Sequence, residues 1–544
     1  MSPPCPPATA RRYPVGSRPR RPRRVAATVV LGLALGVPLA TAASAAGGPA
    51  LAVQSPVLPP RLPAAVDPFP GAQESAPNRG PLAPAPPAPV TGEGRGWLGW
   101  TGIGLLLAVT AVLATVATTT LTWMLHAWRT PADLEATRFA STIGRPVRRF
   151  SLLVPARHEE AVLGETLDRL AAVDYPDMEV LAIVGHDDPG TTAVAEAAAR
   201  RHPGRVRVVV DHSWPKNKPK ALNTALESCR GDVVGVFDAE DEVHRDLLRH
   251  VDARFTEAKA DIVQGGVQLM NVHSSWWSLR NCLEYYFWFR SRLHFHAGRG
   301  FIPLGGNTVF VRTDLLREAG GWDADCLAED CEIGVRLSTR GARVAVAYDP
   351  ELVTREETPG TLRSLVKQRT RWDQGFLQVL RKGVWRDLPT RRQRALARYT
   401  LASPFLQAFT GVMIPVSVYL MVAVKVPTWV VLLTLVPLVP ALMTLVVEAC
   451  GFADFCRAYG VRGRPRDYVA LVLGAFPYQL LLAFAALRAV VRELRGDASW
   501  EKTEHAGAHR APAQPDLVID LRDRPRAGVA TDSERTGSEM EAAR

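Results

Sequence analysis

The seven cysteines of this 544-residue chain do not form a single Cys-x-x-Cys pair. Zinc sites and redox-active dithiols are usually built from such pairs, so neither a zinc site nor a disulfide framework is indicated. The chain also lacks a Gly-x-x-x-x-Gly-Lys-Ser/Thr loop, and Gly231 and Gly235 do not complete a dinucleotide-binding fingerprint. ATP hydrolysis by a P-loop and hydride transfer therefore have no motif here.

Basic residues outnumber acidic ones by 11, but they are not gathered with aromatic residues as a nucleic-acid-binding face requires. Many of the arginines instead flank long apolar segments, which is the arrangement that orients a chain in a membrane. We therefore predict membrane lipids, and no nucleic acid, as partners.

The N-terminal region is predicted to target or anchor the chain. Residues 1–24 form a basic arm without acidic residues, and residues 25–46 are apolar or small throughout. This pattern is typical of either a cleaved signal peptide or a first transmembrane segment. Residues 47–95 are rich in Pro, Ala and Gly and are predicted to form an extracytoplasmic linker.

Residues 97–128 carry no charge, begin and end with Trp, and exceed the roughly 20 residues that a membrane-spanning helix needs. We predict a transmembrane helix here, followed by a cytoplasmic domain over residues 147–398. This orientation is the same whether the first apolar segment is cleaved or kept.

The C-terminal membrane region, residues 401–491, contains three apolar segments and is predicted to make two or three spans. The predicted loop between the last two segments is basic and therefore expected in the cytoplasm; it contains Arg457, Arg462, Arg464 and Arg466. Three full spans would then place the tail, residues 492–544, outside the cell. The arginines at the end of the last segment favour the inside: Arg488, Arg492 and Arg495. Either segment 401–424 or the last one, which Pro477 interrupts, is therefore a candidate for an interfacial or re-entrant segment. The tail itself is polar and expected to be disordered.

Between residues 147 and 398, short β-rich runs alternate with helical stretches. Such alternation is typical of right-handed βαβ units and predicts an α/β fold with a mostly parallel sheet. The predicted strands are Ser151–Pro155, Val180–Val184, Val206–Val210, Val233–Phe237 and Val309–Val311. Residues 362–382 have apolar positions at helical spacing and are predicted to form an interfacial helix.

Three carboxylates follow the strand that ends at Phe237: Asp238, Glu240 and Asp241. Ligands bind at the carboxyl ends of the strands in open α/β sheets, so these residues are candidate ligands of a hard cation that bridges phosphates. A solvated acidic turn that caps the next helix is the alternative. Lys218 and Lys220 open a predicted helix, where they could meet a diphosphate beside the metal.

Asp330 lies near the start of the predicted helix Glu332–Thr339, where it would stay ionised and could act as a general base. A plain N-cap is the alternative. Gln368, Arg371 and Trp372 share one face of the predicted interfacial helix. Packing or membrane anchoring would also explain Trp372, but an exposed indole can stack on a sugar, and an arginine suits a leaving diphosphate.

Six motifs, taken in order, resemble the inverting family 2 glycosyltransferases, above all the membrane-embedded branch that contains bacterial cellulose synthase and hyaluronan synthase. They are Val154-Pro-Ala-Arg-His-Glu-Glu160, Lys218-Pro-Lys-Ala-Leu-Asn223, Asp238-Ala-Glu-Asp241, Gly306-Asn-Thr308, Glu329-Asp330 and Gln368-Arg-Thr-Arg-Trp372. The resemblance covers residues 147–398, and the flanking spans more loosely. It implies a GT-A fold, which is Rossmann-like with a mostly parallel sheet.

On the donor side, the resemblance implies that Ala156, Glu159 and Asp187 bind the uridine, with Lys220 near the diphosphate. Asp238 and Glu240 would hold Mg²⁺ or Mn²⁺. Glu240 stands where the family usually has a second Asp, which leaves open whether Glu240 or Asp241 reaches the metal.

On the acceptor side, Asp330 matches the family's catalytic base and follows Glu329 in the Glu-Asp motif. Gln368, Arg371 and Trp372 match the acceptor and pyrophosphate site. Ala328 departs from the Thr that is more common before this motif. The sequence Trp500-Glu-Lys-Thr-Glu-His505 resembles a gating segment that contacts the nucleotide in cellulose synthases, and this role requires a cytoplasmic tail.

The resemblance thus predicts a multi-pass enzyme of the cell membrane that transfers a sugar from a UDP-sugar to a growing β-glycan. UDP-glucose is the first candidate donor and UDP-N-acetylglucosamine the second. Polysaccharide-export subunits are candidate partners. One alternative is a non-processive enzyme that glycosylates a lipid such as diacylglycerol. Another is a non-catalytic membrane scaffold that only binds nucleotide.

Overall fold

The computed structural model describes residues 97–138, 145–423, 426–501 and 509–510. All of these belong to the second of two units into which the chain divides, residues 91–544. The predictions for residues 1–24, 25–46 and 47–95 lie outside the described residues, as does most of the predicted tail.

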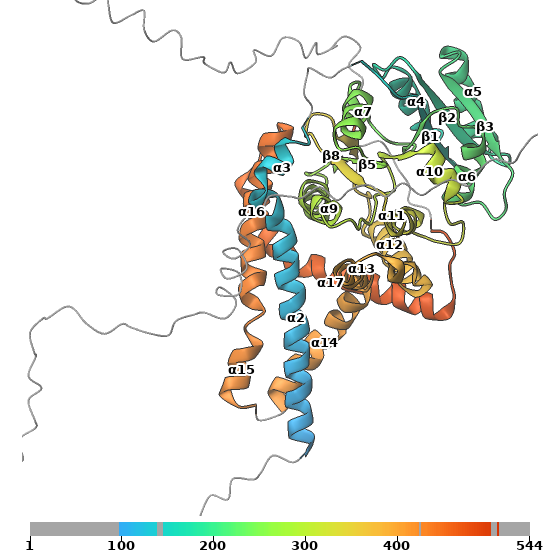
Figure 1. Cartoon of the computed structure of the whole chain (residues 1–544). Helices are drawn as coiled ribbons and strands as arrows, with labels where there is room; N and C mark the ends of the chain where they lie inside the picture. Colours follow the sequence, from blue (N-terminus) through green and yellow to red (C-terminus); the bar gives the residue numbers. More distant parts are fainter. Residues whose placement is uncertain (1–96, 139–144, 424–425, 502–508, 511–544) are drawn as a thin grey trace, which may run out of the picture. The chain divides into compact units, whose positions relative to one another are not determined.

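A seven-stranded sheet with the order β3-β2-β1-β4-β7-β5-β8 organises the region between the apolar helices (Figure 1). β1 pairs in parallel with β2 and β4, β2 with β3, and β5 with β8, whereas β7 runs antiparallel to β4 and β5. A short second sheet pairs β6 with β9. The predicted α/β class with a mostly parallel sheet is confirmed. The strands are β1 (Phe150–Ala156), β2 (Met178–Gly185), β3 (Val206–Asp211), β4 (Val233–Val236), β5 (Ile262–Gly265), β6 (Val267–Leu269), β7 (Val309–Arg312), β8 (Val344–Ala347) and β9 (Thr354–Glu356).

Each face of the sheet is covered by its own apolar core. Along β1, Phe150, Leu152 and Val154 enter one core and Leu153 enters the other, because successive side chains of a strand point to opposite faces. The first core includes side chains of α4 (Leu163–Ala171), α5 (Pro189–Arg201) and α7 (Leu247–Glu257). The second includes side chains of α6 (Lys218–Ser228), α10 (Thr313–Glu318) and α11 (Glu329–Thr339).

The helix α12 spans Leu362–Lys382, the bounds predicted for the interfacial helix. The hydroxyl of Thr361 caps it by accepting the Ser364 N–H, and Gly383, with a φ of 76°, ends it. The helix α11 begins three residues earlier than predicted, with Ala328 as its N-cap residue. Asp330 therefore lies in the first turn, and the alternative that Asp330 is a plain N-cap is wrong.

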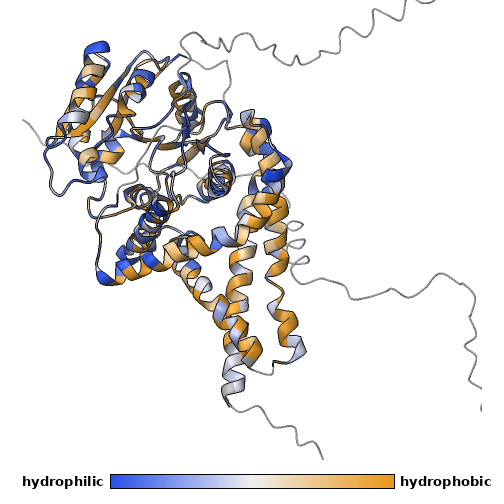
Figure 2. Ribbon diagram, turned by 180° about the vertical axis from the view of Figure 1, so that it is seen from behind, coloured by the Kyte–Doolittle hydropathy of each residue, from blue (hydrophilic) through white to orange (hydrophobic). Residues whose placement is uncertain are grey.

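Four helical segments within the described residues are long and apolar enough to cross a membrane: Gly99–Arg129, Ser403–Val422, Thr428–Tyr459 and Pro465–Arg495. In Figure 2 the ribbons of these segments are coloured mostly as hydrophobic residues. They correspond to α2 (Trp97–Arg129), α14 (Ser403–Ala423), α15 (Thr428–Thr434) with α16 (Leu438–Tyr459), and α17 (Pro465–Arg495).

The predicted apolar segments are thus helical, but one boundary was wrong. Arg457, predicted to lie in a loop, belongs to the last turn of α16, which ends at Gly460 in the left-handed conformation. The helix α2 packs against α14 and α16, and α17 packs against α12 and α14. The other helical elements are α3 (Pro131–Glu135), α8 (Trp276–Phe287), the π-helix η1 (Trp288–Arg292), α9 (Leu293–Ala297), the 3₁₀ helix η2 (Val384–Asp387) and α13 (Arg391–Leu401).

Gly235 allows β4 to pack closely on its neighbours, which gives a test of the fold. A Cβ atom at Gly235 would lie 2.7 Å from Cε1 of Phe310 on β7. We expect Gly235→Ala to cost about 1–3 kcal/mol through overpacking and to lower the melting temperature of the detergent-purified protein by several degrees. Gly360→Ala is the matched control, since nothing lies within 4 Å of a Cβ there. Equal melting temperatures for the two variants would contradict this packing.

Candidate active site

A cavity of about 1330 Å³ lies where the carboxyl ends of β1, β2 and β4 face α11 and α12. Pockets for one small ligand are roughly 300–1,000 Å³, so this cavity has room for a donor and part of an acceptor. Most of the predicted site residues line it, whereas Asp187 and Asp241 do not. Those that line it are Ala156, Glu159, Lys218, Lys220, Asp238, Glu240, Glu329, Asp330, Gln368, Arg371 and Trp372.

The ammonium of Lys218 sits among the carboxylates of the cavity. It donates to Oδ1 of Asp238 at 2.5 Å and to the carbonyl oxygen of Gly306 at 2.9 Å. Burial lowers the pKa of Lys218, but Asp238, Glu329 and Asp330 outweigh burial, and the net effect raises this pKa. A Cβ atom at Gly306 would lie 3.0 Å from Oδ2 of Asp330 and 3.7 Å from Nζ of Lys218. Gly306 therefore leaves room for the Lys218 and Asp330 side chains beside each other.

Burial and the nearby positive charge shift the pKa of Asp330 in opposite directions. Burial raises its pKa above the usual range, whereas the Cys331 N–H, 2.7 Å from Oδ1, and the Lys218 ammonium lower it. The start of α11 favours the ionised form, as predicted, but burial has the larger effect and the net pKa of Asp330 is raised. For Glu329, burial and the neighbouring Asp330 raise the pKa to about 7. Because the pKa values of both neighbouring carboxyl groups are raised, a proton taken up here belongs to the pair and not to one residue.

The three predicted metal ligands have different surroundings. The carboxylate of Asp241 is fully buried, where it accepts the Asp238 N–H at 2.8 Å and the amide of Asn307 at 3.1 Å. Burial raises the pKa of Asp241, and the same Asn307 amide also donates to Glu356. Asp238 and Glu240 instead face the cavity. Two carboxylates are suitable ligands for Mg²⁺ or Mn²⁺, so these two residues fit a metal site.

Two of the predicted nucleotide-binding residues, Asp187 and Lys220, are already bound to protein groups. Asp187 forms a bidentate ion pair with Arg157 at 2.9 and 3.0 Å, and this hydrogen bonding lowers the pKa of Asp187 to about 2. Arg157, which the sequence reasoning missed, lines the cavity in place of Asp187. The ammonium of Lys220 is bound to the carbonyl oxygens of Trp214 and Pro215, at 3.1 and 3.2 Å.

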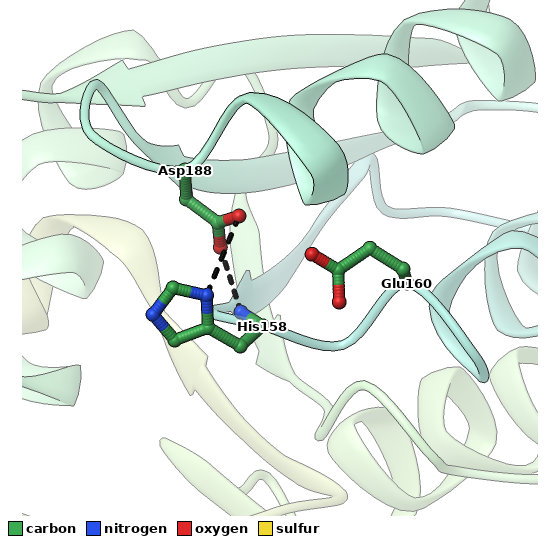
Figure 3. Close-up of side chains that lie close together, drawn as sticks. All are labelled: His158, Glu160 and Asp188. Atoms are coloured by element: carbon green, nitrogen blue, oxygen red, sulfur yellow. Dashed lines mark hydrogen bonds and ion pairs between the residues drawn. The ribbon is translucent and has the colours of Figure 1, made fainter.

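Among the described residues, His158, Glu160 and Asp188 form a group with metal-binding spacing, because one ligand atom of each lies within 4.8 Å of the others (Figure 3). Asp188 already has protein partners, since it accepts the backbone N–H of His158 at 2.6 Å and that of Thr191 at 3.3 Å. The Asp188 side chain caps the N-terminus of α5. Its hydrogen bond with the His158 N–H supports the left-handed backbone of His158, which has a φ of 54°. We interpret this group as a structural anchor of the loop after β1.

The helix α12 brings the predicted acceptor-side residues to the cavity. The guanidinium of Arg371 lies 4.4 Å from the centre of the Trp500 ring. Burial lowers the pKa of Arg371, against the opposing effect of Glu329, Asp238 and Asp330. The carbonyl oxygen of Gln368 is buried without a hydrogen-bond partner among the described residues. The Trp372 ring lies 6.2 Å from that of Tyr285, centre to centre.

Residues beyond the last apolar helix complete the site. Glu501 accepts hydrogen bonds from Arg488 at 2.7 Å, and its backbone oxygen accepts one from Arg371 at 3.3 Å. Arg510 donates to the carbonyl oxygens of Val162 at 3.1 Å and Glu240 at 3.0 Å. The motif that begins at Trp500 predicted that the tail contacts the site, whereas no sequence pattern predicted the contacts of Arg510.

Comparison with known proteins agrees with this geometry. Residues 146–375 match the family model described as glycosyltransferase like family 2. The chain is 30% identical over 243 residues to a β-monoglucosyldiacylglycerol synthase of Synechocystis, covering 44% of this chain and 50% of that protein. It is 26% identical over 251 residues to the poly-β-1,6-N-acetyl-D-glucosamine synthase of Staphylococcus aureus, covering 44% of this chain and 58% of that protein. The chain thus spans only about half the length of these relatives.

A solved structure with similarity is the mannosyltransferase PcManGT from Pyrobaculum calidifontis in complex with GDP-Man and Mn²⁺. It is 20% identical, with a TM-score of 0.46, and the alignment covers 72% of this chain and 99% of that one. Together, the family match over residues 146–375, the α/β architecture and the motifs around the cavity show that this part of the chain is a family 2 glycosyltransferase domain, flanked by helical segments long and apolar enough to cross a membrane.

Proposed function

We propose that this glycosyltransferase transfers a hexose from a UDP-sugar to a hydroxyl group of a membrane-associated acceptor, with inversion at the anomeric carbon. The observation that carries the proposal is that Asp238 and Asp330 face one cavity on either side of Lys218. One carboxylate is thereby available to the donor diphosphate and its cation, and the other to the acceptor. UDP-glucose remains the first candidate donor.

The reaction is a single displacement. The acceptor oxygen forms a bond to the anomeric carbon while the bond from that carbon to the diphosphate oxygen breaks, and its electron pair leaves with UDP. Asp330 takes the acceptor proton. Lys218 and Arg371 offset the negative charge that grows on the leaving diphosphate. Asp238 and Glu240 would hold Mg²⁺ or Mn²⁺, which when bound offsets further diphosphate charge.

Two acceptors remain candidates. The growing β-glycan follows from the motifs, and the relative named as a poly-β-1,6-N-acetyl-D-glucosamine synthase supports it. A lipid acceptor is supported by the relatives named as β-monoglucosyldiacylglycerol synthases. Both are compatible with a cavity that α2 and α14 line with Val116, Thr120, Leu406, Gln407 and Thr410.

We infer a multi-pass location with the glycosyltransferase domain in the cytoplasm. Trp500 and Arg510 contact this domain, so the domain and these tail residues lie on one side of the membrane. An even number of crossings must then separate them, although three apolar helical segments intervene. The contacts of Tyr478 with Arg369 and of Glu493 with Gln374 align α17, from Tyr478 onward, with α12. We therefore assign α17 to the interface and the other two segments to crossings.

The first test identifies the labelled product. Membranes that contain the chain, incubated with radiolabelled UDP-glucose, are expected to yield either an ethanol-insoluble polymer or a chloroform-soluble lipid. Asp330→Asn should reduce the labelled product by at least about 100-fold, because the base is lost, while UDP still binds. Asp314→Asn, an exposed carboxylate on α10, is the control. Undiminished transfer by Asp330→Asn would refute the proposal.

The pH profile tests the role of Lys218. Its ammonium lowers the pKa of Asp330, which must be deprotonated to act as a base. Lys218→Gln removes this effect, so the pKa of Asp330 should rise and the acid limb of kcat/KM should move to higher pH. Lys220→Gln is the control, since Lys220 binds the carbonyl oxygens of Trp214 and Pro215. We expect it to leave the position of the acid limb unchanged. A shift to lower pH in Lys218→Gln would be inconsistent with this arrangement.

Metal titration separates the two candidate second ligands. EDTA should abolish transfer, and Mn²⁺ or Mg²⁺ should restore it. Glu240→Gln is expected to raise the metal concentration for half-maximal activity by at least about tenfold, since losing even a ligand's supporting partner typically costs that much. Asp241→Asn should instead lower the melting temperature without changing the metal requirement, because Asp241 is buried against Asn307. The reverse pattern would assign the metal to Asp241.

A further inference from the structure

Arg292, the last residue of the π-helix η1, lines the cavity with a guanidinium that forms no ion pair with any residue that the structure describes. It lies 3.8 Å from the centre of the Trp123 ring and 4.6 Å from that of Trp288. Its Nε and Nη2 atoms are buried and have no hydrogen-bond partner among the described residues. The two indole rings hold the cation in place but satisfy none of these donors.

The charged groups around Arg292 do not neutralise it. Burial lowers the pKa of Arg292 to about 10, with Tyr399 and Glu284 as the groups that act in the opposite direction. The carboxylate of Glu284 is already used, since it accepts two hydrogen bonds from Arg369, at 2.7 and 2.9 Å, and one from Tyr478, at 2.9 Å. A buried charge without a partner is unfavourable, so this site is suited to an anion.

The surrounding fold places this cation near the end of a span. The hydroxyl of Ser291 donates to the carbonyl oxygen of Trp123 at 2.6 Å and accepts the Ala127 N–H at 2.9 Å, which fixes η1 to α2. Trp123 precedes Arg129, the last residue of α2, by six positions, or roughly 9 Å along the helix axis. Lipid headgroups and interfacial Trp residues lie at such a depth.

The same cavity connects Arg292 to the reaction centre. Phe289, one turn before Arg292, approaches Gly305, because a Cβ atom there would lie 3.4 Å from Cζ of Phe289. The next residue, Gly306, adjoins Asp330. On its other side the cavity is lined by the apolar and hydroxyl side chains of α2 and α14.

We propose that the membrane end of the cavity binds the phosphate-bearing headgroup of an acceptor lipid, with Arg292 as the anion-binding residue. The proposal rests on the proposed function and specifies its acceptor. A guanidinium matches a phosphate by paired hydrogen bonds, whereas a neutral glycan or a diacylglycerol would leave Arg292 without a counter-ion. The acyl chains would lie along α2 and α14, and a headgroup hydroxyl beyond the phosphate would reach Asp330.

The test is ligand binding by the full-length protein in a neutral detergent, followed by Trp fluorescence, because two indole rings flank Arg292. The probes are dioctanoyl phosphatidylglycerol, dioctanoylglycerol and inorganic phosphate. Wild-type protein should prefer phosphatidylglycerol to dioctanoylglycerol by about tenfold or more, the usual value of a hydrogen-bonded charge pair. Arg292→Gln should lose this preference, and Arg292→Lys should retain part of it. Arg290→Gln, on the same π-helix but outside the cavity lining, is the control and should retain all of it.

Release of UDP from UDP-glucose separates failure of this inference from failure of the proposed function. Phosphatidylglycerol should stimulate release by the wild type and by Arg290→Gln, but not by Arg292→Gln, while all three still bind UDP. An unchanged lipid preference in Arg292→Gln would overturn the inference and leave the proposed function intact. Displacement of the lipid by an equal concentration of inorganic phosphate would also overturn it, because the site would then serve a free anion. Absence of UDP release from the wild type under every condition would refute the proposed function itself.

Discussion

The ammonium of Lys218 is the charge on which the proposed reaction centre depends. It faces the carboxylates of Asp238, Glu329 and Asp330 in one cavity, where their negative charges would otherwise have no nearby cation of this kind. The position of Lys218 is set by the start of α6, because the Asn217 side chain caps this helix and also donates to the Ala324 carbonyl oxygen at 2.8 Å. One turn further on, the side-chain amide of Asn223 donates to the Trp322 carbonyl oxygen at 2.7 Å and accepts the Trp322 N–H at 2.8 Å. The first turns of α6 therefore connect the donor side to the loop before Asp330.

A close contact between Gly375 and Ala328 fixes the position of α12 beside the proposed acceptor site. A Cβ atom at Gly375 would lie 2.4 Å from Cβ of Ala328, so α12 passes directly over the residue that precedes Glu329 and Asp330. The side chain of Gln378 supports the same contact by accepting the Leu327 N–H at 2.8 Å. This packing explains why residues some forty positions apart in the sequence meet at one cavity. It also gives a physical context for Ala328, which replaces the more common Thr.

Periodicity and motif spacing predicted β1 to β4 and β7, the α/β class and both ends of α12, because these depend on local patterns of apolar residues and caps. The short strands β5, β6, β8 and β9 were not predicted. These patterns did not predict the antiparallel direction of β7, which depends on its insertion between β4 and β5. The choice between Glu240 and Asp241 also required packing, since only the structure buries Asp241 against Asn307. Arg292 carried no motif at all. The guanidinium of Arg292 lies against the ring of Trp123, which is on α2 and far away in the sequence. The carboxylate of Glu284 is not available to Arg292 because it binds Arg369.

The contacts of η1 argue that the glycosyltransferase domain and the apolar helices work as one structure. The Ser291 hydroxyl bridges the Trp123 carbonyl oxygen and the Ala127 N–H, replacing a backbone hydrogen bond within α2. Further along, one apolar core joins Met124 of α2, Tyr286 and Phe287 of α8, and Phe452 of α16. Because these buried contacts link the domain to two apolar helices, a fragment limited to residues 146–375 would expose this core to water. Such a fragment would also lose Trp123, the α14 wall of the cavity and Trp500. The cavity is therefore a property of the whole described chain and not of the domain alone.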